Sequence, residues 1–220
     1  KVYKNFKQAS LLIEEGLKDF CLDKNKVCED EFYVNNSIEN ILLNLGEVLS
    51  YLSEKDDYLS PFFLSNACID GNLNRVKRYV AQEGRSVNDK IPFKIETPLH
   101  LAIANERWEV VRFLIKNGAN TLAVDEDGNT PLNVSVSANI DSPKDIIKAL
   151  INPETLNKDD RFGQMPLYKA IMTDKPAAVK ILLEAGANCS SKFSNGLTPM
   201  MLALEFGHIE CARELQKLGY

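Results

Sequence analysis

The sequence predicts an all-α protein built as a solenoid of stacked repeats, preceded by a small helical region. Two observations support this prediction: a six-residue phrase recurs at a nearly fixed spacing, and apolar side chains lie at helical spacing ahead of the first copy. The phrase begins at residues 97, 130, 165 and 198, so its steps are 33, 35 and 33 residues. A period in this range is typical of stacked repeats, which present an extended surface rather than a single buried pocket.

The recurring phrase has the chemistry of a helix start. Its copies are Thr97-Pro98-Leu99-His100-Leu101-Ala102, Thr130-Pro131-Leu132-Asn133-Val134-Ser135, Met165-Pro166-Leu167-Tyr168-Lys169-Ala170 and Thr198-Pro199-Met200-Met201-Leu202-Ala203. A threonine hydroxyl can cap the first turn of a helix, and proline suits the first helical position because no N–H is needed there. Each copy is therefore expected to begin a helix.

A second pattern follows the phrase and indicates a second helix in each unit. Trp108–Asn120 and Val179–Asn188 share apolar spacing and a glycine stop, at Gly118 and Gly186. Glycine adopts the left-handed conformation that ends many helices. Turn-forming residues then precede the next phrase, as in Asp127-Gly128-Asn129-Thr130.

With these motifs, residues from about 60 to 220 resemble an ankyrin repeat array. The resemblance implies a β-turn finger followed by two antiparallel helices in each unit. Aligning Gly71 with Gly207 recovers a degenerate first unit, which gives five repeats starting near residues 60, 95, 128, 163 and 196. The third repeat departs from the family pattern, because it has Asn133 and Ser135 where the family prefers His and Ala. It also carries extra residues at 139–143, and Pro143 is expected to start its second helix.

Residues 1–58 lack the repeat and are predicted to form a helical N-terminal capping region, with the ankyrin domain at 59–220. Apolar residues from Ile38 to Leu52 form a helical stripe, and a terminal repeat needs cover for its apolar face. An alternative is that this region docks a second partner. It holds 7 Lys and Arg against 12 Asp and Glu, so it carries the whole net charge of -5.

The composition excludes several classes of function. Because Lys and Arg balance Asp and Glu in residues 59–220, no basic stripe is available for nucleic acid or an anionic membrane surface. No apolar run is long enough for membrane insertion. The five cysteines form no C-x-x-C pair, so reduced thiols in a cytoplasmic protein are expected. Since the first residue is not Met, the chain is interpreted as a piece of a longer protein.

The residue inventory also argues against an enzyme. The chain has two histidines, and the resemblance implies structural positions for both His100 and His208. None then remains for a nucleophile pair or a histidine metal site, and no phosphate-binding glycine motif occurs. We therefore predict no catalytic residue, no metal and no cofactor. The run Asp125-Glu126-Asp127 is interpreted as a solvated finger, with contact to a basic partner as the alternative.

The resemblance implies that a partner protein binds the concave face, which consists of the finger tips and the exposed side of each first helix. The candidate contact residues on this face are Phe93, Lys94, Glu126, Asp127, Asn129, Arg161, Phe162, Gln164, Met172, Asn195 and Phe206. Four phenylalanines, at 93, 162, 193 and 206, lie in or beside it. Each either anchors a partner or folds back against its own array. Trp108 is expected to pack at the start of a second helix.

Two functions from different classes follow. The first is a monomeric protein-interaction module, cytoplasmic, or acting in the host cytosol if the protein is a secreted effector. The second is a substrate-recognition arm of an enzyme whose catalytic domain lies outside this chain. The Lys-, Asn- and Ile-rich usage hints at an AT-rich genome, and such genomes encode ankyrin effectors of intracellular bacteria and poxvirus host-range factors.

Overall fold

The structure is a computed structural model that describes residues 61–90, 94–138, 141–189, 192–193, 195–217 and 219. All of these residues belong to one compact unit. The predicted helical region at residues 1–58 lies outside the described residues. The division of the chain into a cap and a repeat domain therefore stays a prediction.

The described residues form helices and no strand. The helices are α3 (Pro61–Asp70), α4 (Leu73–Val80), α5 (Pro98–Ala104), α6 (Trp108–Lys116), α7 (Pro131–Ser137), α8 (Lys144–Leu150), α9 (Pro166–Met172), α10 (Pro176–Glu184), α11 (Pro199–Glu205) and α12 (Ile209–Lys217). They make five consecutive pairs, joined by short turns. The prediction of an all-α repeat solenoid is confirmed.

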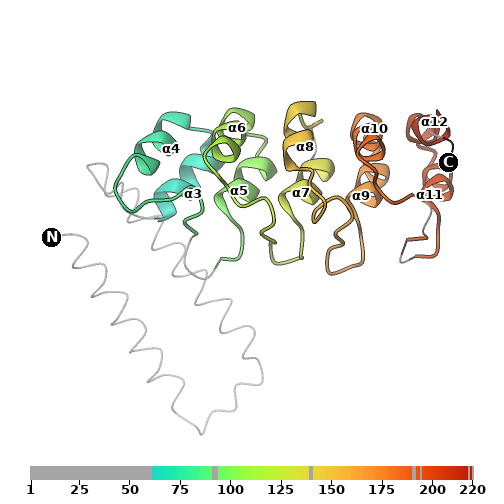
Figure 1. Cartoon of the computed structure of the whole chain (residues 1–220), viewed down its shortest axis with the longest axis horizontal. Coiled ribbons are helices and arrows are strands. Elements are labelled where there is room, and N and C mark those ends of the chain that lie inside the picture. Colours follow the sequence, from blue (N-terminus) through green and yellow to red (C-terminus); the bar gives the residue numbers. More distant parts are fainter. Residues whose placement is uncertain are drawn as a thin grey trace, which may run out of the picture. The chain divides into compact units, whose positions relative to one another are not determined.

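The helix pairs stack side by side in two rows (Figure 1). The odd-numbered helices, here called inner helices, form one row, and each contacts the next inner helix along the chain. The even-numbered, outer helices form the second row. The loop before each inner helix from α5 onward, here called a finger, extends from the inner row in Figure 1. Every repeat therefore contacts mainly its neighbours, as expected of a solenoid.

The helix starts follow the repeated phrase. The side chains of Thr97, Thr130 and Thr198 each accept a hydrogen bond from the backbone N–H three residues later. Such a cap contributes about 1 kcal/mol. Met165 has the same extended backbone before α9 but no hydroxyl to cap the helix. At the other end, Gly118 has φ +81°, which confirms the left-handed stop expected there.

The third repeat accommodates its extra residues by a polar contact. After α7 the chain becomes extended at Ala138, and α8 begins at Lys144 with Pro143 as the preceding cap residue. The buried hydroxyl of Ser142 donates to the carbonyl oxygen of Ser135 at 2.6 Å. This bond ties the inserted segment to α7 through the backbone of Ser135, which any residue would supply. The Ser135 hydroxyl itself donates to the carbonyl oxygen of Leu132 at 2.9 Å, within α7.

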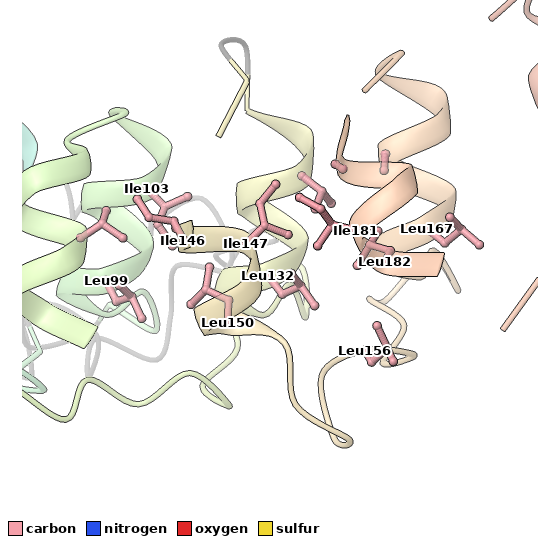
Figure 2. Close-up of a cluster of buried hydrophobic side chains, with 14 of the residues drawn as sticks. Leu99, Ile103, Leu132, Ile146, Ile147, Leu150, Leu156, Leu167, Ile181 and Leu182 are labelled. Carbon is pink, nitrogen blue, oxygen red and sulfur yellow. The ribbon is translucent and has the colours of Figure 1, made fainter. Parts of the chain in front are cut away.

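A continuous apolar core lies between the two rows and between adjacent pairs. Leu99, Leu132 and Leu167 occupy the same position in three inner helices and are almost fully buried. Figure 2 shows them with the isoleucines and leucines of the outer helices, filling the space between neighbouring pairs. The core therefore extends along the array rather than around one centre.

One inner-helix position shows that each repeat needs its successor. Ile103, Val136 and Ile171 are at most 1% exposed. Leu204 holds the equivalent position in the fifth repeat and is 58% exposed. The first three side chains are covered by the next inner helix, whereas the fifth repeat has no described successor. Burial at this position therefore comes from stacking between repeats, not from the helix pair itself.

Replacing Ile171 with Ala should lower the free energy of unfolding by about 2–5 kcal/mol, because a fully buried side chain is removed and a cavity remains. Leu204→Ala is the matched control at the equivalent position. It should change stability by no more than about 0.5 kcal/mol, as for other exposed substitutions. Urea unfolding followed by circular dichroism measures both. Equal losses would contradict the stacking account.

Candidate functional site

His100 connects the second repeat to the finger of the third. Its ring is buried, with Nδ1 2.8 Å from the Thr97 hydroxyl and Nε2 3.0 Å from the carbonyl oxygen of Asn129. Because a carbonyl oxygen can only accept, Nε2 carries the proton and Nδ1 acts as acceptor. Burial lowers the pKa of His100, against the opposing effect of the Asn129 carbonyl. The structural role predicted for this histidine is confirmed.

Later repeats have other residues at the position of His100, but each of these also contacts the next finger. In the third repeat, Nδ2 of the buried Asn133 faces the carbonyl oxygen of Lys158, at 3.4 Å. In the fourth repeat, Tyr168 packs edge-to-face with Phe193, with ring centroids 4.9 Å apart. Each side chain therefore contacts the finger of the following repeat, by a polar contact in two cases and by aromatic packing in the third.

A largely buried ion pair fixes the fourth finger to its inner helix. The Nζ of Lys169 lies 2.7 Å from Asp160 Oδ2, and the Asp160 side chain is 0% exposed. The same Nζ donates to Asn129 Oδ1 at 2.7 Å, which adds the finger of the preceding repeat. Burial opposes ionisation of Asp160. The lysine and the backbone N–H groups of Phe162 and Gln164 outweigh it, so the pKa of Asp160 lies below its ordinary value.

Two fingers use the same turn. Asp125 Oδ1 accepts hydrogen bonds from the backbone N–H groups of Asp127 and Asn129, at 2.9 and 2.8 Å. Asp160 Oδ1 accepts equivalent bonds two and four residues later, at 2.8 and 2.9 Å. An aspartate that bonds its own following backbone fixes a tight turn. The carboxylate of Asp125 is thus engaged within the finger, while the two acidic residues after it stay exposed.

The third and fourth fingers are joined by their backbones. The N–H of Arg161 donates to the carbonyl oxygen of Asp127 at 2.9 Å. Gly128 sits at this junction with φ +81°, and a Cβ there would lie 3.1 Å from the Arg161 nitrogen. Glycine is therefore needed both for its conformation and for the close approach. The two finger tips form one continuous edge.

The structure leaves six of the predicted contact residues exposed. They are Glu126, Asp127, Arg161, Phe162, Asn195 and Phe206. The two phenylalanines are 63% and 50% exposed, respectively. Exposed aromatic rings of this kind are candidates for anchoring a partner, because burying them on binding removes a large apolar area from water.

Four other predicted contact residues are half-buried. Lys94 Nζ lies 4.0 Å from a Glu96 carboxylate oxygen, and Asn129 is bound by the polar groups described above. Met172 packs against the core, and the carbonyl oxygen of Gln164 accepts from the N–H of Asp160. Phe93 lies outside the described residues. The whole set remains a predicted contact surface, of which the exposed members form the larger part.

The phenylalanines on this face, which the sequence did not distinguish, differ in their exposure. Phe193 is only 4% exposed, because its ring is covered by Tyr168. It folds back into the array and anchors nothing outside. Phe162 and Phe206 remain exposed, as stated above. Trp108 is half-buried and packs against the core, which confirms the packing role expected for it.

Sequence reasoning missed the pairing of Lys169 with Asp160. A signal was present, because the equivalent positions in other inner helices hold Leu101, Val134 and Leu202. A lysine at a repeat position that is otherwise apolar indicates a partner carboxylate nearby. The identity of that carboxylate depends on the finger turn, which places Asp160 inward and the next two side chains outward.

The described residues hold little reactive chemistry. Among them, no cluster of three His, Cys, Asp or Glu side chains could hold a metal ion. Burial raises the pKa of the Cys68 thiol to about 12, and burial together with Asp174 does the same for Cys211. Thiols with raised pKa values are poor nucleophiles at neutral pH. No helix within the described ranges is long and apolar enough to span a membrane.

Comparison with known proteins agrees with the geometry. The family model for ankyrin repeats in three copies matches residues 64–152 and 136–220. The chain belongs to the ankyrin repeat family. Ankyrin repeats are non-catalytic modules that bind other proteins. The recognition made from the Thr-Pro phrase is therefore confirmed.

Among curated proteins, the chain is similar to arrays in very different parents. It is 26% identical over 165 residues to human transient receptor potential cation channel subfamily A member 1, covering 74% of this chain and 14% of the channel. It is 33% identical over 126 residues to the phosphocholine transferase AnkX of Legionella pneumophila, covering 53% and 12%. It is 32% identical over 151 residues to the probable 26S proteasome regulatory subunit p28 of Saccharomyces cerevisiae, covering 63% and 64%. The chain thus spans less than two thirds of each relative's length.

The buried histidine should make stability depend on pH. Because the pKa of His100 is lower in the folded chain than its ordinary 6.5, the unfolded chain takes up the proton first as the pH falls. The contribution of His100 to the free energy of unfolding should therefore be full above about pH 6.5. It should decrease as the pH falls from there to the pKa of the folded chain. His100→Asn reproduces the side chain of Asn133 without the titration. The difference in unfolding free energy between wild type and variant should shrink from about pH 7.5 to 5.5; a constant difference would contradict this role.

Removing Lys169 should strand the buried carboxylate of Asp160. Lys169→Met should lower the free energy of unfolding by about 3–5 kcal/mol, the usual cost of breaking a buried ion pair from one side. The matched control is Lys180→Met, since Lys180 is exposed and its nearest carboxylate oxygen lies 3.9 Å away. Urea unfolding at neutral pH should show little change for the control. A similar decrease in the free energy of unfolding for both variants would contradict a particular stabilising role of the buried ion pair.

Proposed function

We propose that this chain is a protein-interaction module that binds its partner on the concave face. The observation that supports this most directly is the exposure of Phe162 and Phe206 on that face, at 63% and 50%. Phe193, which lies in the same region, is buried by its neighbour. The two exposed rings present apolar surface that a partner can bury, whereas the third packs within the fold.

The fixed fingers support the same proposal. The Asp125 and Asp160 turns, the backbone bond from Arg161 to Asp127 and the Lys169 ion pair hold the finger tips in place. A surface that is ordered before binding loses less conformational entropy when the partner arrives. The exposed phenylalanines would then bind as pre-positioned anchors on a monomeric, cytoplasmic protein.

The alternative function is a substrate-recognition arm for a catalytic domain outside this chain. Its support is the similarity to AnkX, a protein named as a phosphocholine transferase, of which the matching region is a small part. The same similarity supports an effector that acts in the cytosol of a host cell. A reading frame that encodes a catalytic domain beside the array would favour this alternative.

The double substitution Phe162→Ala and Phe206→Ala should weaken capture of partner proteins from a eukaryotic cytosolic extract by at least about tenfold, since aromatic anchors dominate such interfaces. The melting temperature should stay close to that of the wild type, because both rings are exposed. Quantitative pull-down with mass spectrometry and a thermal melt provide the two measurements.

Ile209→Ala is the matched control for this experiment. Ile209 is 51% exposed at the start of the outer helix α12, outside the concave face. Its removal should leave capture unchanged. Capture that survives the phenylalanine substitutions, or that is lost with the control, would place the binding surface elsewhere.

A further inference from the structure

The concave face is not uniform along the array, and its apolar side chains gather at the C-terminal end. At one inner-helix position the second and third repeats have Ala104 and Ser137, whereas the fourth has Met172. At the next position, Asn105 in the second repeat is replaced by Phe206 in the fifth. All four methionines of the chain also fall in the last two repeats. Methionine and phenylalanine provide adaptable apolar contacts that alanine and serine cannot match.

The polar side chains of the second and third repeats are directed to their own helices. The Asn105 side chain donates to the Leu101 carbonyl at 2.8 Å, and the Ser137 hydroxyl donates to the Asn133 carbonyl at 3.0 Å. Because these groups are engaged within their own inner helices, they offer few hydrogen bonds to a partner on the concave face. The apolar anchoring sites of the face are therefore Met172, Phe206 and the finger-tip Phe162.

The charge beside these anchors is negative at the tip of the third finger. Glu126 and Asp127 are exposed on the third finger, which is joined by its backbone to the finger of Phe162. Among the described residues, no side-chain hydrogen bond or ion pair engages either carboxylate. Glu205 is exposed directly before Phe206, whereas the exposed basic side chains nearby lie on other fingers, Lys158 and Arg161 on the fourth and Lys192 on the fifth. The third finger thus favours a basic group of the ligand over an acidic one.

From this arrangement, and resting on the proposed function, we propose that the partner presents a basic, apolar segment. Its apolar side chains contact Phe162, Met172 and Phe206 on the last two repeats. A lysine or arginine of the segment faces Glu126 and Asp127 on the third finger. Charge complementarity of this kind mainly sets specificity and association rate, so the interaction should weaken as salt is raised.

The test is selection of binding peptides from a random-peptide phage library on the purified whole chain, followed by fluorescence polarisation with the synthetic peptides that are enriched. The enriched sequences should combine Lys or Arg with Leu, Ile, Phe or Trp a few residues away. Glu126→Gln with Asp127→Asn should reduce affinity by about tenfold and flatten the salt dependence. The matched control is Glu109→Gln with Glu184→Gln, which removes equal charge from exposed sites on the outer helices α6 and α10 and should leave the affinity unchanged.

A further variant separates the two proposals. Met172→Glu places a charge among the apolar anchors and should abolish binding. If Met172→Glu abolishes binding while the Glu126 and Asp127 substitutions leave it unchanged, or if the enriched peptides lack basic residues, the basic segment is wrong although the concave face still binds. If all concave-face variants bind every selected peptide as the wild type does, the proposed function itself fails.

Discussion

The second, third and fourth repeats each depend on burial of the inner helix beneath the next repeat. Ile103, Val136 and Ile171 reach almost complete burial only because the following inner helix covers them, and Leu204 shows the same position uncovered. A pair of short helices cannot bury enough apolar surface alone, so stability builds up through neighbouring interfaces. The two rows of helices, the extended core and the regular placing of the fingers all follow from this requirement.

The polar contacts then determine how firmly each finger is held. His100 and Asn133 reach the next finger with a ring or amide nitrogen, while Tyr168 and Phe193 achieve the same by aromatic packing. Lys169 adds a largely buried ion pair with Asp160 of the fourth finger. These contacts engage the inward-facing groups of the fingers, and several of the side chains at the tips are exposed. The scaffold and the binding surface are thus made by the same turns.

Much of this architecture could be predicted from sequence, because its signals are local. The Thr97-Pro98 pair determines where a helix starts, and Gly118 shows where one ends, so the five helix pairs could be predicted without structural information. The structural role of His100 followed from its place in the repeated phrase. The exposure of individual finger residues does not follow from these helix signals, because it depends on the position of each residue within the finger turn. Phe193 holds the turn position of Asp125 and Asp160, where Tyr168 covers its ring, whereas Phe162 lies two residues further along its own finger and is exposed.

The central claim is that a partner protein binds the fingers and inner helices and leaves the outer helices untouched. Hydrogen–deuterium exchange of the chain, alone and with a partner captured from extract, tests it most directly. Slower exchange should appear at the third and fourth fingers and at the ends of α9 and α11, with α4, α6, α8, α10 and α12 unchanged. Protection confined to the outer helices would contradict the claim.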